Sequence, residues 1–254
     1  MISLHRIPSI YAMALFGLLY AVPAAAWQMD ELGAWATKGR PSAVTYSRGF
    51  SGTCLGCDLT GRNLNGARLA GGNFSGSHFS GAIMRRADLS RGNFVGAEFD
   101  RSDLDNADLS SGLFSGASFV GAALAGIDGT GANISRANFT GASMARAGLV
   151  GANLSGCNFT AVRGREITLT NSNLSGCRFD SAQLVGADFS SANLRGARAN
   201  RANLTGADFR LANLSSADFS GAIGLTRGAL EGACGDENTR LPDGFAIPAC
   251  RGRR

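Results

Sequence analysis

Residues 137–156 read ANFTG-ASMAR-AGLVG-ANLSG, which is four successive five-residue units. The first residue of each unit is alanine, and the third is large and apolar. The column of third residues extends from Leu59 to Phe219 without a slip in phase, and 30 of its 33 positions are Leu, Phe, Ile or Met. A period of five fits neither the period of a helix nor that of a flat strand, so the chain has to turn once in every unit.

Within this column, the same type of residue also recurs at every fourth unit, that is every 20 residues. Its phenylalanine series is interrupted by Ala199 and consists of Phe79, Phe99, Phe119, Phe139, Phe159, Phe179 and Phe219. If each unit forms one side of a square, four units close one coil, and successive coils stack at the ~4.8 Å spacing of neighbouring strands. The rings of the series are therefore expected to stack on one another inside the coils.

Two of the three exceptions in the column, both of them glycines, test this geometry. At Gly129 the bulk is missing, but the usually small position two residues earlier carries Ile127. At Gly164 the neighbouring small positions carry Val162 and Ile167. Such exchanges conserve the volume of a core, so we expect repacked coils here and not boundaries between domains.

Units of the form Ala-(Asp/Asn)-(Leu/Phe)-x-Gly, as in residues 152–156 (ANLSG), fill about two thirds of the chain. They resemble the repeats of the pentapeptide-repeat family. The resemblance implies an all-β fold, a right-handed quadrilateral parallel β-helix, often closed by a helix at one end. We assign about eight 20-residue coils to residues 54–224. The resemblance implies little about function, because members that share this fold have unrelated activities.

Residues 1–26 differ from the rest of the chain. His5 and Arg6 precede an apolar run over residues 10–22, and small residues lead up to Ala26. This pattern predicts a signal peptide over 1–26, and therefore export to the periplasm or the extracellular space. An uncleaved anchor is the alternative, but a run of about 13 residues is shorter than the roughly 20 that span a bilayer. Without the leader the net charge falls from +5 to +4, because Arg6 is lost.

The two ends of the repeat region need covers, because a solenoid exposes core side chains there. Residues 27–53 carry no repeat and are interpreted as an N-terminal lead-in. Residues 225–254 are interpreted as a helix over 226–233, capped by Thr226, followed by a loop that a Cys234–Cys250 disulfide closes. Such a disulfide is expected to contribute about 3 kcal/mol. This tail is similar to C-terminal segments in exported bacterial members of the family.

Cys54 and Cys57 form a CxxC motif, which is typical of a redox pair, of half a metal site or of a capping disulfide. The sequence has no second CxxC and no suitably spaced histidine pair to complete a zinc site. A structural disulfide is therefore the favoured interpretation. Cys157 and Cys177 are one coil apart in the small column. We expect two buried thiols there, with a disulfide as the alternative.

The sequence does not indicate a catalytic, metal or cofactor site. Asp or Asn fills 19 of the 34 positions before the central column, and these side chains are expected to hydrogen-bond the local backbone at each turn. A local acidic patch is interpreted as a solvated surface, with a cation or partner site as the alternative; it consists of Glu98, Asp100, Asp103, Asp105 and Asp108. Outside the leader, His78 is the one histidine, and no nucleophile motif accompanies it. We therefore predict a protein that is not an enzyme and needs no cofactor.

Arginines gather near two corners of the coil. Arg85, Arg86, Arg146 and Arg165 fall near one corner, and Arg178 and Arg198 lie one above the other near another. They are candidates for an interaction surface. The alternative is a role in solubility, because acidic residues are interspersed. The modest net charge does not indicate a nucleic-acid partner, and no membrane span is expected after removal of the leader.

The function predicted from these features is a non-enzymatic, exported, rigid scaffold that binds one or more proteins. One alternative comes from the resemblance, since several similar proteins bind DNA gyrase by mimicking DNA. A mimic should be an acidic cytoplasmic rod, whereas this chain has a leader and an isoelectric point near 9.1. A redox or metal-handling protein that uses the CxxC motif is the other alternative.

Overall fold

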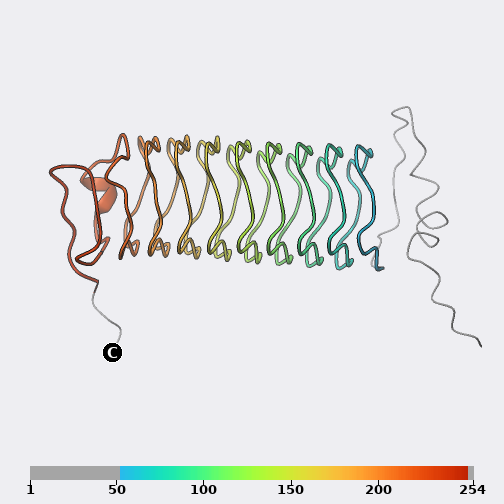
Figure 1. Ribbon diagram of the computed structural model, residues 1–254, viewed down its shortest axis with the longest axis horizontal. Coiled ribbons are helices and arrows are strands. Elements are labelled where there is room, and N and C mark those ends of the chain that lie inside the picture. The colour runs from blue at the N-terminus through green and yellow to red at the C-terminus, as the bar shows by residue number, and fades with distance from the viewer. Residues whose placement is uncertain (1–51, 251–254) are drawn as a thin grey trace, which may run out of the picture.

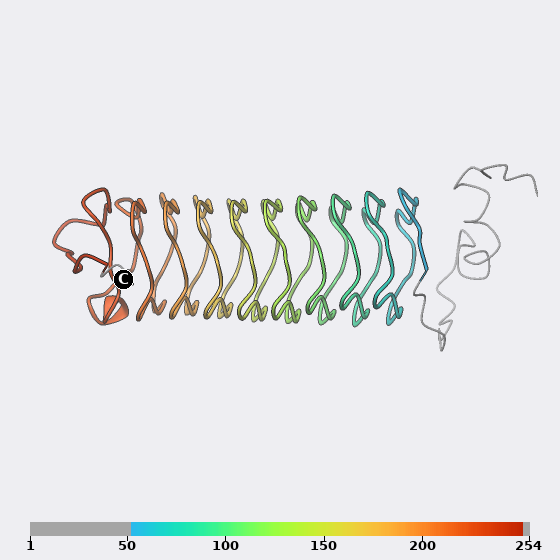
Figure 2. The same ribbon diagram turned by 90° about the horizontal axis from the view of Figure 1, so that it is seen from below.

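The computed structural model describes residues 52–250, which form a rod of stacked coils (Figures 1 and 2). The rod begins near Thr53, and the C-terminal tail, residues 225–250, lies at its opposite end. The predicted signal peptide and nearly all of the predicted lead-in lie outside the described residues.

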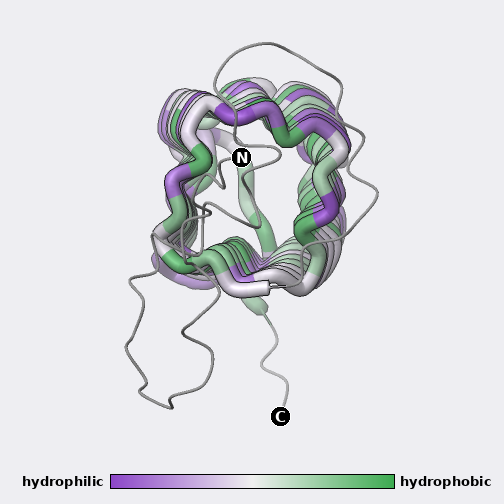
Figure 3. Tube along the Cα trace, turned by 90° about the vertical axis from the view of Figure 1, so that its right-hand side faces the viewer, coloured by the Kyte–Doolittle hydropathy of each residue, from purple (hydrophilic) through white to green (hydrophobic). Residues whose placement is uncertain are grey.

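Each coil consists of four units, as the period of the sequence predicts. Parallel β-bridges join equivalent residues of successive coils, from Thr53↔Asn73 to Asn203↔Ile223. Each side of a coil contributes one residue to these bridges. In the described part of the repeat region, the β-structure therefore consists of single-residue bridges and not of extended strands. Viewed along its axis, the chain has the four-sided outline of a quadrilateral β-helix (Figure 3).

The corners are turns that a backbone hydrogen bond closes. At one of them the N–H of Arg62 donates to the carbonyl of Leu59 over 3.2 Å, and Gly61 between them has a φ of +64°. Asp58 accepts a hydrogen bond from the backbone N–H of Thr60 over 3.0 Å. At many other Asp and Asn residues the side-chain oxygen likewise accepts a hydrogen bond from the backbone N–H two residues later. These side chains therefore bond the local backbone at the turns, as predicted.

The interior is filled by the central column and the small column. Phe119 is fully buried, and its ring centroid lies 4.9 Å from those of both Phe99 and Phe139. The stack continues from Phe79 to Phe179 with neighbouring centroids 4.8–5.1 Å apart. A second stack packs beside it and consists of Phe74, Phe94 and Phe114. The rings thus lie along the axis as the phenylalanine series predicts.

The two atypical positions are repacked coils, as predicted. A Cβ atom added at Gly129 would lie 2.6 Å from the Leu149 side chain, so the space is already taken. Ile127 is buried beside it. At Gly164 the neighbouring space is filled by Leu184 and Val162.

The C-terminal tail leaves the period of the coils after Ile223. The predicted helix over 226–233 is wrong in extent, because the structure has only a three-residue 3-10 helix, η1 (Gly228–Leu230). Gly228 begins it, and Gly232, at a φ of +68°, turns the chain directly after it. Thr226 does accept a hydrogen bond from the N–H of Ala229, over 3.3 Å.

The tail covers the last coil by pairing with its backbone. The N–H groups of Phe209, Leu214 and Phe219 donate to carbonyls of the tail over 2.7–2.8 Å. The bridge Asn213↔Cys234 is one position longer than the bridges between coils, and Asp218↔Arg240 is two positions longer. The register of the tail therefore drifts away from that of the coils.

Candidate functional site

The described coils present four outer faces, which we name after interior residues of one coil: the Phe74, Phe79, Met84 and Leu89 faces. Each face consists of the outward side chains that flank the named residue and its equivalents in the other coils. Because the interior is filled, any binding chemistry of the coils belongs to these faces.

The Phe74 face is uncharged over most of its length and carries a ladder of asparagines. The ladder consists of Asn73, Asn93, Asn133, Asn153, Asn173, Asn193 and Asn213. The side-chain amide of Asn153 donates to the side-chain oxygen of Asn133 over 3.2 Å, and the next two steps repeat this bond at 3.2 Å. Leu113 interrupts the ladder and is exposed.

The Phe79 face changes sign along the rod. Near its beginning, Nδ1 of His78 lies 2.9 Å from a carboxylate oxygen of Glu98. Further along, Arg178 and Arg198 are bridge partners in successive coils, so the predicted pair is stacked. Arg178 also forms an ion pair with Asp180 over 3.2 Å.

The Met84 face holds the other predicted arginines, but they do not form one cluster. Arg85 and Arg86 lie three coils before Arg146 and four coils before Arg165. Arg85 donates through Nε to Asp103 over 2.5 Å, and this hydrogen bond raises its pKa. The sequence placed the four arginines near one corner, and the 20-residue period already separates them along the rod by three and four coils.

The Leu89 face carries most of its charge as a column of aspartates. The column consists of Asp88, Asp108, Asp128, Asp188 and Asp208. Each carboxylate accepts the backbone N–H two residues later. Asp208 also pairs with Arg210 over 2.6 Å, and the hydrogen bond from Arg210 lowers its pKa.

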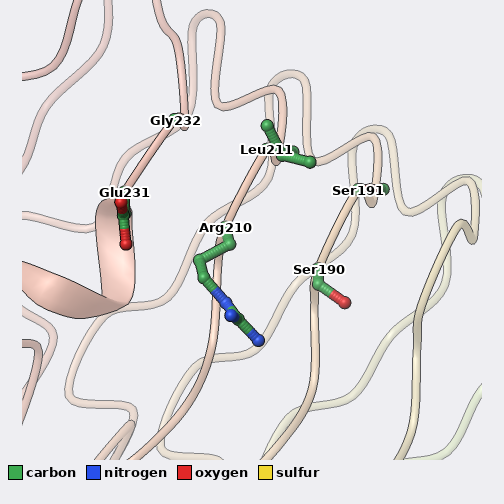
Figure 4. Close-up of a pocket in the computed structure, with 6 residues that line it drawn as sticks. All are labelled: Ser190, Ser191, Arg210, Leu211, Glu231 and Gly232. Atoms are coloured by element: carbon green, nitrogen blue, oxygen red, sulfur yellow. The ribbon is translucent and has the colours of Figure 1, made fainter.

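A shallow pocket of about 490 Å³ lies where the Leu89 face meets the C-terminal tail (Figure 4). Its lining consists of Ser190, Ser191, Arg210, Leu211, Glu231 and Gly232. Leu211 is 69% exposed and contacts the tail at Gly232. The sequence does not predict this pocket, because Glu231 and Gly232 lie outside the repeat and nothing in their spacing places them beside Arg210.

The cysteine pairs close both ends of the described rod. The sulfur atoms are at bonding distance in Cys54–Cys57 and in Cys234–Cys250. Cys54 is 5% exposed and Cys57 is 1% exposed. The buried hydroxyl of Ser77 donates to the carbonyl of Cys54 over 2.7 Å and accepts the N–H of Cys57 over 3.1 Å. Oxidation of the pairs in the cell stays a prediction, and their geometry is compatible with it.

Cys157 and Cys177 are free and buried, which is the state that we expected. Each thiol donates to a backbone carbonyl over 3.0 Å, that of Ile134 or that of Leu154. Burial raises the pKa of Cys177 well above its ordinary value. Because both thiols are buried, they are interpreted as inert parts of the core.

The described residues offer little for chemistry. Within 52–250 no three His, Cys, Asp or Glu residues are grouped so that they could hold a metal ion. His78 lies in the second coil, whereas the pocket lies at the tail. No helix in this part of the chain has the length and apolar character of a membrane span.

Comparison with known proteins agrees with the repeat geometry. A family model described as "Pentapeptide repeats" matches in eight copies, in segments that together cover residues 54–163 and 165–223. No curated protein matches the chain.

Among solved structures, HetL is similar to this chain. HetL is a pentapeptide repeat protein involved in the regulation of heterocyst differentiation in the cyanobacterium Nostoc sp. strain PCC 7120. It is 27% identical with a TM-score of 0.52, and the match covers 76% of this chain and 90% of HetL. QnrB1, a plasmid-mediated fluoroquinolone resistance protein, is 25% identical with a TM-score of 0.48, and the match covers 73% of this chain and 94% of the QnrB1 chain. With its repeats, its coil geometry and the family model in agreement, the chain belongs to the pentapeptide repeat family.

Proposed function

We propose that this protein is an exported, non-enzymatic scaffold that binds another protein through one of its flat outer faces. The observation that carries the proposal is the division of the coils into a filled interior and four faces of different chemistry. A filled interior leaves no enclosed space for a substrate, whereas regular faces present side chains at fixed spacing to a protein partner.

The four faces differ enough to select a partner. The Phe74 face offers amide groups with little charge, the Leu89 face offers carboxylates, and the other two faces carry both signs. Charge complementarity of this kind contributes to specificity and to the rate of association. HetL, which the chain matches over most of its length, is involved in regulation, and this supports a role in binding.

Export is supported by the pattern of the leader and by the two cysteine pairs. Disulfides persist outside the cytoplasm, and both pairs are placed so that they could form one. Mass measurement of the protein purified from cell fractions tests this point. We expect a chain that begins at Trp27, recovered outside the cytoplasm, with four hydrogens fewer than the fully reduced form.

The two alternatives have weaker support. DNA mimicry favours an excess of acidic charge, but the chain without its leader carries a net charge of +4. Thiol exchange at the CxxC motif requires an accessible sulfur, but Cys54 and Cys57 are buried.

The proposal is tested by affinity capture from envelope extracts with the mature chain and two face variants as bait. One variant, Arg178→Gln with Arg198→Gln, neutralises part of the Phe79 face. The other, Asp188→Asn with Asp208→Asn, neutralises part of the Leu89 face. We expect a protein that the wild-type chain retains and that a variant of one face releases while the other variant keeps it.

Two results would count against the scaffold. One is that no protein is retained by the wild-type chain. The other is that every bait, including an unrelated rod-shaped protein, retains the same set of proteins. A measured turnover of any substrate by the purified chain would contradict the non-enzymatic part of the proposal.

A further inference from the structure

The Met84 face carries two blocks of opposite charge at a fixed separation. Asp103 and Asp105 flank the interior position of one coil, and Arg163 and Arg165 flank the same position three coils later. The two coils between them present only small side chains on this face, namely Ala123, Ala125, Ser143 and Ala145.

This arrangement is self-complementary under a two-fold axis that lies in the plane of the contact, perpendicular to the long axis of the rod. The axis passes between the two coils of small residues. The axis turns a second rod antiparallel and brings each column of side chains against the same column of the other copy. Asp103 then meets Arg163 of the second copy, and Asp105 meets Arg165 of the second copy. Symmetry repeats both pairs, which gives four ion pairs around a flat centre.

We infer that the Met84 face binds a second copy of this chain and forms an antiparallel, side-by-side dimer. The small central side chains let the two faces approach closely. Because all coils have the same rise, the charged blocks come into register together once one pair is aligned. The inference does not depend on the proposed binding of a foreign protein.

The charged groups have capacity for these contacts. The side chain of Arg163 is exposed and has no hydrogen bond or ion pair to any residue within 52–250. Arg165 is 72% exposed, and the one ion pair that it forms within the described residues is with its chain neighbour Glu166, over 3.1 Å. Asp103 is 25% exposed and accepts hydrogen bonds from Arg85 and from the backbone N–H of Asp105, and Asp105 accepts the backbone N–H of Ala125. A carboxylate has about four acceptor positions, so both keep capacity for a further bond.

The other coils of the Met84 face do not oppose this register. Ile83 meets Gln183 of the second copy, and Arg85 meets Val185 of the second copy, so no like charges face each other there. On the turn beside the face, Arg101 meets Ala161 of the second copy.

The neighbouring charged faces fit a second copy less well. The same operation on the Leu89 face sets Asp88 against Asp188 of the second copy. On the Phe79 face, the register that pairs Glu98 with Arg178 sets Asp100 against Asp180, and the register that pairs Glu98 with Arg198 gives two such ion pairs, whereas the Met84 face gives four. Like charges that face each other suppress association, so the Met84 face is the favoured one.

The size of the face predicts a weak dimer. Eight coils give a length of roughly 40 Å, and about three extended residues give a width of roughly 10 Å. Each copy would therefore bury on the order of 400 Å², about half of what a partner buries in a standard interface. Ion pairs at such an interface are screened by salt, so dimerisation should depend on both protein concentration and ionic strength.

Sedimentation equilibrium of the purified mature chain tests the inference. At low salt and high protein concentration we expect the apparent mass to double, and we expect the monomer mass to return in high salt. The variant Asp103→Arg with Asp105→Arg, and the variant Arg163→Asp with Arg165→Asp, should each stay monomeric. A mixture of the two should form a heterodimer, because one chain then carries four arginines and the other four aspartates at the contact. The chain with all four changes should dimerise again.

A matched control is Asp88→Arg with Asp108→Arg, which changes the net charge by the same amount on the Leu89 face and should leave the dimer intact. Circular dichroism checks that each variant keeps the coil structure. A wild-type chain that stays monomeric at low salt would overturn the inference. A dimer that both reversals of the Met84 face leave unchanged would overturn it as well, as would a mixture of the two variants that stays monomeric.

Discussion

The coils and the C-terminal tail of this protein are held together in different ways. In the coils, the bridges recur from one coil to the next, and a buried ring such as Phe119 has an equivalent one coil above and one coil below. In the tail, single contacts hold the chain, such as the Cys234–Cys250 pair and the carboxylate of Asp236 on Ser216. A change in a coil therefore disturbs a continuous core, whereas a change in the tail releases a local segment.

The largest effect is expected from a cavity in the phenylalanine stack. Phe119→Ala removes a fully buried ring that lies 4.9 Å from the rings on both sides. The free energy of unfolding should fall by about 3–5 kcal/mol, as measured by unfolding in guanidinium chloride. The matched change in the tail is Phe245→Ala, where the ring is only partly buried against the core.

Phe245→Ala should lower the stability of the coils by less than half as much as Phe119→Ala. If the two changes cost the same, the tail would be part of one cooperative core, and the contrast between the two regions would be wrong.

The second effect concerns the disulfide predicted in the tail. Cys234→Ser with Cys250→Ser removes a cross-link that closes a sequence separation of 16, and the loss should be about 3 kcal/mol. We expect the loss to appear as faster proteolysis between residues 234 and 250, while the circular dichroism of the coils is unchanged. The same two substitutions at Cys54 and Cys57, where the separation is 3, serve as the control at the other end. Loss of the coil signal in the tail variant would contradict a local role.

The contrast between the regions also explains what the sequence could predict. The repeat at every fourth unit predicted the stacking of Phe79 on Phe99 and the filling of the space at Gly129, because the same constraint recurs in every coil. Nothing recurs in the tail, so the length of η1 and the pocket beside Arg210 depend on contacts that are made once. The ion pair of Arg85 with Asp103 was not predicted for a related reason. It joins neighbouring coils through flexible side chains that the period does not position.

A smaller effect is expected at the corners, where two successive coils offer a matched pair. Gly141 has a φ of +69° with no atom near its missing Cβ, and Ala161 occupies the equivalent corner of the next coil with a φ of 56°. The left-handed conformation strains residues that carry a Cβ atom, and glycine avoids this strain. Gly141→Ala should therefore lower the free energy of unfolding by about 1 kcal/mol, and Ala161→Gly should raise it by a similar amount. Thermal unfolding of both variants measures these changes. If the two substitutions shift the unfolding temperature in the same direction, backbone strain does not determine stability at the corners.

The smallest effect is a dependence on pH that is confined to the tail. Asp236 accepts hydrogen bonds from the hydroxyl and the N–H of Ser216, over 2.8 and 2.7 Å, and the bond from the hydroxyl is the main cause that lowers its pKa below 3.8. A carboxylate whose pKa is lower in the folded state stabilises that state above its ordinary pKa and loses this effect as the pH falls through the lowered value. The protection factors of the tail amides in hydrogen exchange, which are corrected for the intrinsic rate at each pH, should therefore fall below about pH 4, while those of the coil amides stay unchanged. Asp236→Asn should remove this pH dependence. If the tail of this variant responds to acid as the wild-type tail does, another carboxylate such as Asp218, whose pKa is also lowered, holds the tail in place.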